Sequence, residues 1–105
     1  MSAGCLSREQ AIELLRTAEA RIRRFGVRRL ALFGSVVRNE ATPASDVDLL
    51  VEFEPAMKTL ENFMGLAYLL DEVLGRRADI VTTDALSPYI GPYILREAED
   101  VLRAA

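Results

Sequence analysis

The most constraining feature of this chain is a Gly-Ser pair followed, after ten intervening residues, by an Asp-x-Asp triplet. Gly34-Ser35 ends the apolar run 30–33, and Asp46-Val47-Asp48 leads into the apolar run 49–51. Short apolar runs bounded by turn residues are typical of strands. Turn amides and a hydroxyl can bind phosphate oxygens, and paired carboxylates can bind the Mg²⁺ that accompanies them. The pattern therefore predicts a nucleoside triphosphate site between two strands.

Length and charge limit the alternatives. The 105 residues suit a single domain spanning 1–105, and 50% of them are hydrophobic, which is enough for a core. A net charge of −3 argues against a general nucleic-acid binder. The arginines within 21–29 are better explained as a solvated helix end than as a binding patch. We therefore expect no direct binding of nucleic acid.

The residue inventory also bears on compartment and chemistry. Cys5 is the only cysteine, so no disulfide within the chain is possible and a reducing compartment fits. No apolar run approaches the ~20 residues that span a bilayer, and the N-terminus lacks the features of a secretory signal. We expect a soluble, cytoplasmic protein that does not contact membranes. The absence of histidine excludes a histidine nucleophile, base or metal ligand.

Local signals predict strands and helices in alternation. The predicted strands are 28–33, 46–53 and 77–82, with one helical turn at 36–40. The predicted helices are 7–25, which begins with a capping box at Ser7, 59–74, which ends before Gly75, and 92–103, which follows a turn at 88–91. The centre of 46–53 is apolar on both faces apart from Asp48, as expected of a covered central strand.

Three aspartates are candidate metal ligands. Asp46 and Asp48 point to the same face of a strand, ~7 Å apart. Asp79 lies in the third predicted strand between apolar neighbours, where a bare charge is costly. If that strand lies beside 46–53, the three carboxylates form a cluster suited to hard cations and to two-metal phosphoryl chemistry.

Each feature also has a simpler explanation. A Gly-Ser pair alone is usually a turn, and Asp-x-Asp alone often marks a strand that enters from solvent. Asp79 alone could pair with Arg76 or Arg77. Arg38 could reach a triphosphate or be an ordinary surface arginine. The combination, in this order and on strands of the right kind, favours function.

The set Gly34-Ser35-x10-Asp46-x-Asp48 with a later Asp79 resembles the nucleotidyltransferase superfamily that includes DNA polymerase beta. The run 32–38 and the short length look like the minimal nucleotidyltransferases, the MNT group, which are typically encoded beside HEPN-domain proteins in toxin–antitoxin pairs. The similarity extends from about Arg8 to Ala98. Two positions depart from the group: Asn39 stands where many relatives have glycine, and Gly91-Pro92 interrupts the last helix.

The resemblance implies a fold, a chemistry and a partner. The fold is of the α/β (α+β) class, with a short mixed sheet of three or more strands flanked by helices. Mg²⁺, as two ions, is held by Asp46, Asp48 and Asp79, while Gly34 and Ser35 bind the triphosphate, which Arg38 is a further candidate to contact. AMP passes from ATP to an acceptor hydroxyl with release of pyrophosphate, and Asp79 acts as the base.

The acceptor is the open question. The chain has no room for a substrate-binding domain, so we expect a protein acceptor, a tyrosine of a HEPN-type toxin, with this chain as the antitoxin. Helix 60–74 is apolar nearly all round, which favours a second buried side against a partner or a second copy over cover from a neighbouring helix. The alternative is an antitoxin that neutralises by contact alone. Transfer to a small molecule or an RNA end is a third, less favoured reading.

Overall fold

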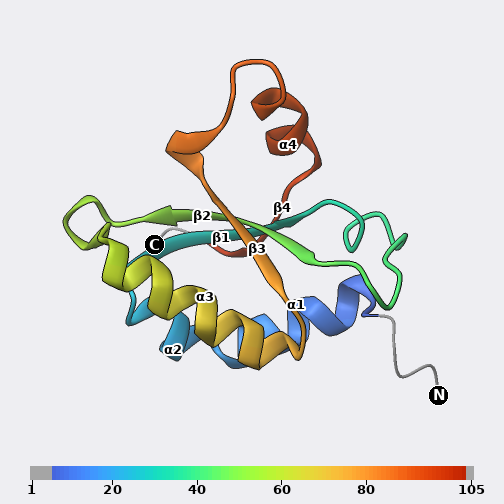
Figure 1. The fold of residues 1–105 in the computed structure, drawn as a ribbon, viewed down its shortest axis with the longest axis horizontal. Coiled ribbons are helices and arrows are strands. Elements are labelled where there is room, and N and C mark those ends of the chain that lie inside the picture. Colours follow the sequence, from blue (N-terminus) through green and yellow to red (C-terminus); the bar gives the residue numbers. More distant parts are fainter. Residues whose placement is uncertain (1–5, 104–105) are drawn as a thin grey trace.

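The computed structural model describes residues 6–103, so Cys5 lies outside the described residues. They form a four-stranded sheet in the order β3-β2-β1-β4 (Figure 1). The elements in chain order are α1 Arg8–Thr17, α2 Glu19–Arg23, β1 Val27–Phe33, β2 Val47–Phe53, a 3₁₀ turn Pro55–Met57, α3 Leu60–Leu74, β3 Ala78–Thr82, a 3₁₀ turn Thr83–Ala85, α4 Gly91–Glu97 and β4 Glu99–Leu102.

The sheet is mixed, as expected. Strand β1 pairs antiparallel with β2 and β4, whereas β2 pairs parallel with β3 across the α3 connection. The three predicted strands are confirmed to within one residue at each end, and β2 is the covered central strand, with only its two polar residues partly exposed. The fold is therefore the mixed α+β arrangement that the resemblance implies.

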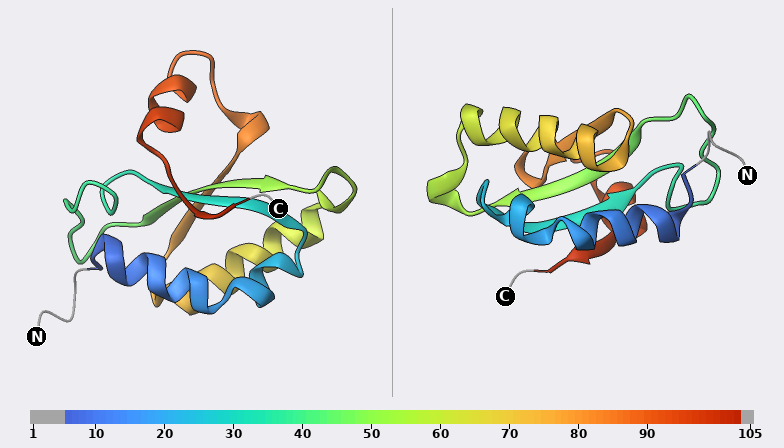
Figure 2. Two further views of the ribbon diagram at one scale, coloured as in Figure 1. Left: turned by 180° about the vertical axis from the view of Figure 1, so that it is seen from behind. Right: turned by 90° about the horizontal axis from the view of Figure 1, so that it is seen from below.

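The two faces of the sheet have different cover. Helices α1, α2 and α3 lie on one face, and α4 with the segment before it lies on the other (Figures 1 and 2). Alternating strand residues supply two apolar clusters. Leu30 and Leu49 belong to the large cluster under the three helices, and Phe33 and Leu50 to a small cluster that Ile94 of α4 joins. By strand alternation, Asp48 of β2 and Asp79 of β3 lie on the α4 face.

Helix α3 matches its prediction. Thr59 caps it by accepting a hydrogen bond from the Asn62 amide at 3.1 Å, and Gly75 ends it in the left-handed conformation with φ of 68°. Leu66 and Leu70 on one side are buried, whereas on the opposite side Leu60 and Tyr68 are 76% and 67% exposed. One apolar side of α3 thus packs in the core, and the opposite apolar side is exposed to solvent within the described residues.

The first predicted helix is interrupted. The capping box at Ser7 is present, but α1 ends at Thr17 and α2 begins at Glu19. The Ala18 amide is shared between the carbonyls of Leu14 and Leu15, at 3.3 and 3.2 Å, which tightens the turn. Because Leu15, Ala18 and Ile22 are all buried, the apolar spacing continues through the break. The helical spacing of apolar residues therefore could not reveal the break between α1 and α2.

The predicted helix 92–103 is wrong in its second half. Helix α4 ends at Glu97, and Glu99–Leu102 forms β4 against β1, where Leu102 pairs with Leu30. Val101 and Leu102 are buried as a result. Local propensity favours helix here, but pairing with an otherwise open edge of β1 outweighs it. The segment 36–40 forms hydrogen-bonded turns and no helix.

No helix within residues 6–103 is both long and apolar enough to cross a membrane.

Candidate active site

The Gly-Ser turn leaves β1 at the edge where β2 begins. Gly34 has φ of +80°, in the left-handed region that favours glycine. The Arg38 amide donates to the Gly34 carbonyl at 3.3 Å, and the Glu40 amide donates to the Ser35 carbonyl at 2.8 Å. These bonds fold residues 34–40 back on themselves. Gly34 is buried and Ser35 is half-buried beside it, so the turn is well defined next to the strand end.

Gly34 is in close contact with Asp48. Phe33 pairs with Asp48 in the β1–β2 ladder, so the next residue of the turn faces the aspartate side chain. A Cβ placed on Gly34 would lie 2.1 Å from Asp48 Oδ2 and 3.1 Å from Asp48 Cβ. Any larger residue would force the turn or the carboxylate to move. This proximity joins the predicted phosphate-binding turn to one of the predicted metal ligands.

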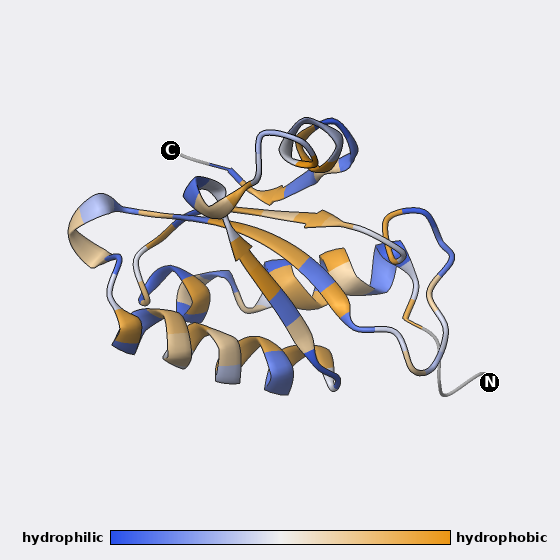
Figure 3. Ribbon diagram, turned by 45° about the horizontal axis from the view of Figure 1, so that its top comes forward, coloured by the Kyte–Doolittle hydropathy of each residue, from blue (hydrophilic) through white to orange (hydrophobic). Residues whose placement is uncertain are grey.

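The three predicted carboxylates lie at one end of β2 and β3. Asp48 and Asp79 are partners in the parallel register, and Asp46 lies one residue before β2. By strand alternation Asp48 shares the face of Leu50 and Asp79 the face of Val81, which is the face that α4 covers. Figure 3 shows β2 and β3 as largely hydrophobic strands, each interrupted by a hydrophilic segment. The predicted juxtaposition of Asp48 and Asp79 is confirmed.

The exposure of Asp79 differs from expectation. Asp79 is exposed, because β3 is an edge strand of the sheet. It therefore has access to water and needs no cation to offset burial. Arg77, one of its possible partners, instead lies 4.0 Å from Asp46, measured between Arg77 Nε and Asp46 Oδ2. Asp48 is the partly buried member of the set.

Burial and then neighbouring like charges perturb Asp48. Burial raises the pKa of the Asp48 carboxyl, and the charges of Asp79 and then Asp46 raise it further, while Arg38 opposes them. A divalent cation would relieve this repulsion, and the oxygen donors suit Mg²⁺. Over the span 6–103, however, no three acidic or cysteine side chains are grouped closely enough to form a ready metal site. The donor set fits the ion, but the three side chains do not yet converge.

The raised pKa has a consequence for the stability of the metal-free protein. At pH values between 3.8, the ordinary carboxyl pKa, and the raised pKa of the folded state, the unfolded chain binds fewer protons at Asp48 than the folded chain does. The free energy of unfolding therefore decreases as pH rises through this range. We expect Asp48→Asn to unfold at a higher temperature than wild type at neutral pH in EDTA. The advantage should shrink as pH falls toward 4. Thermal unfolding across this pH range measures it.

The control for this prediction is Asp84→Asn. Asp84 is exposed and pairs with Lys58 away from the site, so its neutral variant should gain no stability at any pH. If Asp48→Asn were less stable than wild type at neutral pH, the account of repulsion among the carboxylates would be wrong.

Glu97 extends the site beyond the predicted residues, through its contacts with Arg38 and Gly34. Arg38 Nε donates to Glu40 Oε1 at 2.7 Å, and its Nη1 pairs with Glu97 at the end of α4. Glu97 also accepts a hydrogen bond from the Gly34 amide at 3.2 Å. Arg38, Glu97, Tyr93 and Arg96 line a surface pocket of about 390 Å³. Glu97 was missed by sequence analysis because it is 63 residues from Gly34 and carries no local signal.

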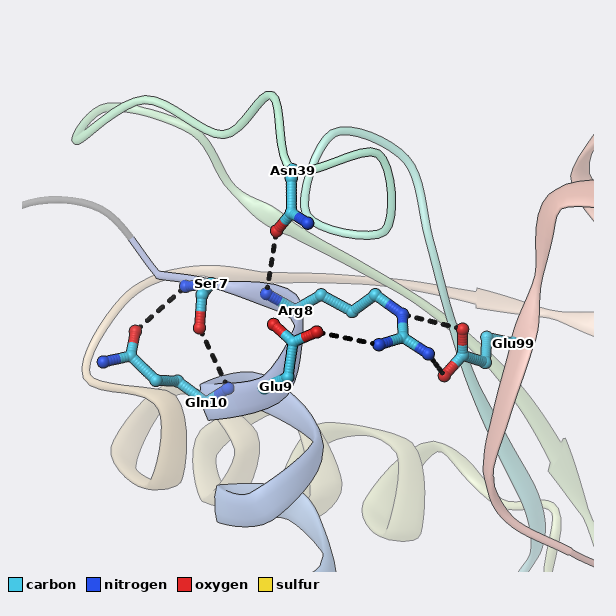
Figure 4. A network of polar contacts seen from close by, with 6 residues as sticks. All are labelled: Ser7, Arg8, Glu9, Gln10, Asn39 and Glu99. Carbon is cyan, nitrogen blue, oxygen red and sulfur yellow. Dashed lines mark hydrogen bonds and ion pairs between the residues drawn. The ribbon is translucent and has the colours of Figure 1, made fainter.

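Asn39 proves compatible with the turn. It has φ of 56°, in the left-handed region, which asparagine tolerates better than most residues. Its side-chain oxygen accepts a hydrogen bond from the Arg8 amide at 3.3 Å, and the Arg8 side chain in turn pairs with Glu99 of β4 (Figure 4). The start of α1 thus ties the Gly-Ser turn to the edge of the sheet. The departure from glycine at this position is supported by the structure.

Comparisons with known proteins agree with this geometry. Residues 14–103 match the family described as "Nucleotidyltransferase domain". "Protein adenylyltransferase MntA" of Thermococcus cleftensis is 46% identical over 74 residues, covering 70% of this chain and 74% of the relative. A solved structure described as a "putative minimal nucleotidyltransferase" has a TM-score of 0.80 and 36% identity, covering 94% of this chain and 98% of that one.

A more distant solved structure resembles this chain in fold alone. It is the MNT antitoxin bound to a tri-AMPylated HEPN toxin of Shewanella oneidensis, with a TM-score of 0.63 and 17% identity, covering 89% of this chain and 73% of that one.

Proposed function

We propose that this chain, which belongs to the nucleotidyltransferase family in its minimal form, transfers AMP from ATP to a hydroxyl of a partner protein. The observation that carries the proposal is the contact between the Gly34 turn and Asp48, with Asp79 beside Asp48 in register. It places amides suited to phosphate next to carboxylates suited to a cation. The similarity to a protein named protein adenylyltransferase supports AMP as the transferred group.

Each residue of the site has a distinct task in this proposal. The Gly34 amide, the Ser35 hydroxyl and Arg38 bind triphosphate oxygens. Asp46, Asp48 and Asp79 would hold Mg²⁺, as two ions. The bound ions would neutralise charge on the phosphates. Substrate binding would require these three side chains to move together, since they form no ready ligand group within the described chain.

The proposed reaction is an in-line displacement. The acceptor oxygen attacks the α-phosphorus of ATP. The bond between that phosphorus and the oxygen that bridges the α- and β-phosphates breaks, and pyrophosphate leaves. The hydroxyl proton passes to Asp79, the exposed member of the set, which a large acceptor can reach from solvent. Asp46 and Asp48 would hold the metal.

A HEPN-type toxin is the proposed partner, with a tyrosine as the acceptor. The support is the distant structure in which an MNT antitoxin binds an AMPylated HEPN toxin. Exposed apolar side chains give this chain surfaces for such contact: Leu60, Met64 and Tyr68 on α3, Tyr93 on α4, and Tyr89 and Ile90 just before α4. The α3 face could equally join two copies of this chain.

The test is transfer of label to a HEPN-type protein that binds this chain. With Mg²⁺ present, ATP labelled at its α-phosphate should label the partner, and ATP labelled at its γ-phosphate should not. Peptide mapping should place the label on tyrosine. No label on a folded partner that binds this chain would refute the proposal, and label from the γ-position would indicate a kinase instead.

Neutralisation by contact alone is the second candidate. The exposed apolar side chains on α3, on α4 and just before α4 favour it, because a contact surface needs no catalysis. It predicts that Asp46→Asn, Asp48→Asn protein still neutralises the toxin in cells. Loss of neutralisation with unchanged partner binding would exclude it.

A further inference from the structure

Glu97 occupies the groups that should bind phosphate. Its Oε2 accepts from the Gly34 amide at 3.2 Å, and its Oε1 pairs with Arg38. One carboxylate therefore engages both a turn amide and a guanidinium through its two oxygens. This is how a phosphate oxygen pair would be bound at the same place. The sequence does not reveal this contact, because Glu97 at the end of α4 is 63 residues from Gly34.

We propose that Glu97 is an internal competitor for the Gly34 amide and Arg38, and that a polyphosphate must displace its carboxylate from these two donors to bind. The inference rests on the proposed function, because it assumes that Gly34 and Arg38 bind phosphate. It goes further by assigning to α4 control over access to the site.

Electrostatics supports displacement over coexistence. Glu97 adds a fourth negative charge beside Asp46, Asp48 and Asp79, since its carboxylate accepts from the Gly34 amide and the Gly34 turn contacts Asp48. If Glu97 stayed in place, its carboxylate and the aspartates would repel a bound triphosphate. The Gly34 amide and Arg38 would also already be engaged by Glu97. Moving the Glu97 carboxylate away frees both donors at once.

The local structure permits this movement. The Glu97 side chain is 26% exposed, so it can turn toward water without unpacking the core. Glu97 is also the last residue of the seven-residue α4, and Ala98 after it is extended with ψ of 134°. Rotation of one flexible side chain suffices, and Arg38 keeps its second partner, Glu40, at 2.7 Å.

The opposite role would be support. If Glu97 merely shapes the Gly-Ser turn, removing it should disorder the turn and weaken phosphate binding. Glutamine separates the two roles, because its amide oxygen can still accept from Gly34 but carries no charge to compete with phosphate. Alanine removes both functions.

The test is titration of the full chain with inorganic tripolyphosphate in Mg²⁺. Glu97→Gln should bind roughly tenfold more tightly than wild type, on the scale of one charged hydrogen bond. Glu97→Ala should also bind more tightly. In wild type, the Gly34 amide resonance should shift as Glu97 is displaced. Glu72→Gln, which changes net charge equally but pairs with Arg21 outside the site, should bind like wild type.

Equal or weaker binding by Glu97→Gln, including no binding by either protein, overturns the inference. Weaker binding by Glu97→Ala alone, with Glu97→Gln unchanged, identifies a turn-shaping role and overturns it as well. Thermal unfolding establishes that each variant is folded. Because tripolyphosphate contains no nucleoside, this outcome is independent of label transfer, so failure of the inference and failure of the proposed function are distinguishable.

Discussion

Replacing Asp46 and Asp48 together by asparagine should reduce AMP transfer to the partner by more than about 100-fold. Disturbing groups that only orient a metal ligand typically costs 10- to 100-fold, and these two residues are proposed as ligands themselves. Asparagine keeps the shape of each side chain but removes the charge that attracts Mg²⁺. The measurement is the initial rate of label transfer from α-labelled ATP at saturating Mg²⁺.

A loss of folding cannot mimic this result. Because the raised pKa of Asp48 reflects burial and repulsion from its neighbours, the neutral variant should be at least as stable as wild type at neutral pH. The expected combination is lost activity with undiminished stability. Asp84→Asn, an exposed carboxylate outside the site, should transfer normally. If the double variant kept more than a tenth of the wild-type rate, these carboxylates would not be the metal ligands.

Gly34→Ala should lower affinity for a non-hydrolysable ATP analogue by at least about tenfold. Two effects combine at this position. Alanine in the left-handed region costs about 1–2 kcal/mol. In addition, the new Cβ would lie 2.1 Å from Asp48 Oδ2, so either the turn or the carboxylate must move. Both are parts of the proposed site. Calorimetric titration in Mg²⁺ measures the loss.

Gly75→Ala is the matched control. Gly75 also has positive φ, at 68°, but it lies at the end of α3 and a Cβ there meets nothing within 4 Å. It should lose a similar 1–2 kcal/mol of stability from the backbone effect alone and bind nucleotide normally. If the two alanine variants bound the analogue equally well, the close contact between Gly34 and Asp48 would have no bearing on nucleotide binding.

Local sequence signals predicted the parts of the site that lie on regular elements. Gly34, Asp46 and Asp48 follow from a turn between two apolar strands, and the register of Asp48 with Asp79 follows once β3 lies beside β2. The exposure of Asp79 could not be predicted, because the local sequence does not indicate which strand lies at the edge of the sheet. Ser35 and Arg38 lie on the turn as predicted, and their binding of nucleotide remains a proposal.

Contacts made across the fold were beyond prediction. Strand β4 exists because β1 has an open edge, which overrides the helical propensity of Glu99–Leu102. The end of α4 at Glu97 then brings that carboxylate to Gly34. The left-handed Asn39 is stabilised by Arg8, 31 residues earlier. In each case the partner is distant in sequence, so no local pattern contains it.

The most direct measurement of the central claim is calorimetric titration of the purified chain with a non-hydrolysable ATP analogue, with Mg²⁺ and then with EDTA. The claim is that the Gly34 turn and the three aspartates form one site for Mg²⁺ and nucleotide. It predicts binding that requires Mg²⁺ and disappears in the Asp46→Asn, Asp48→Asn protein. Equal binding in EDTA, or unchanged binding by the double variant, would contradict it.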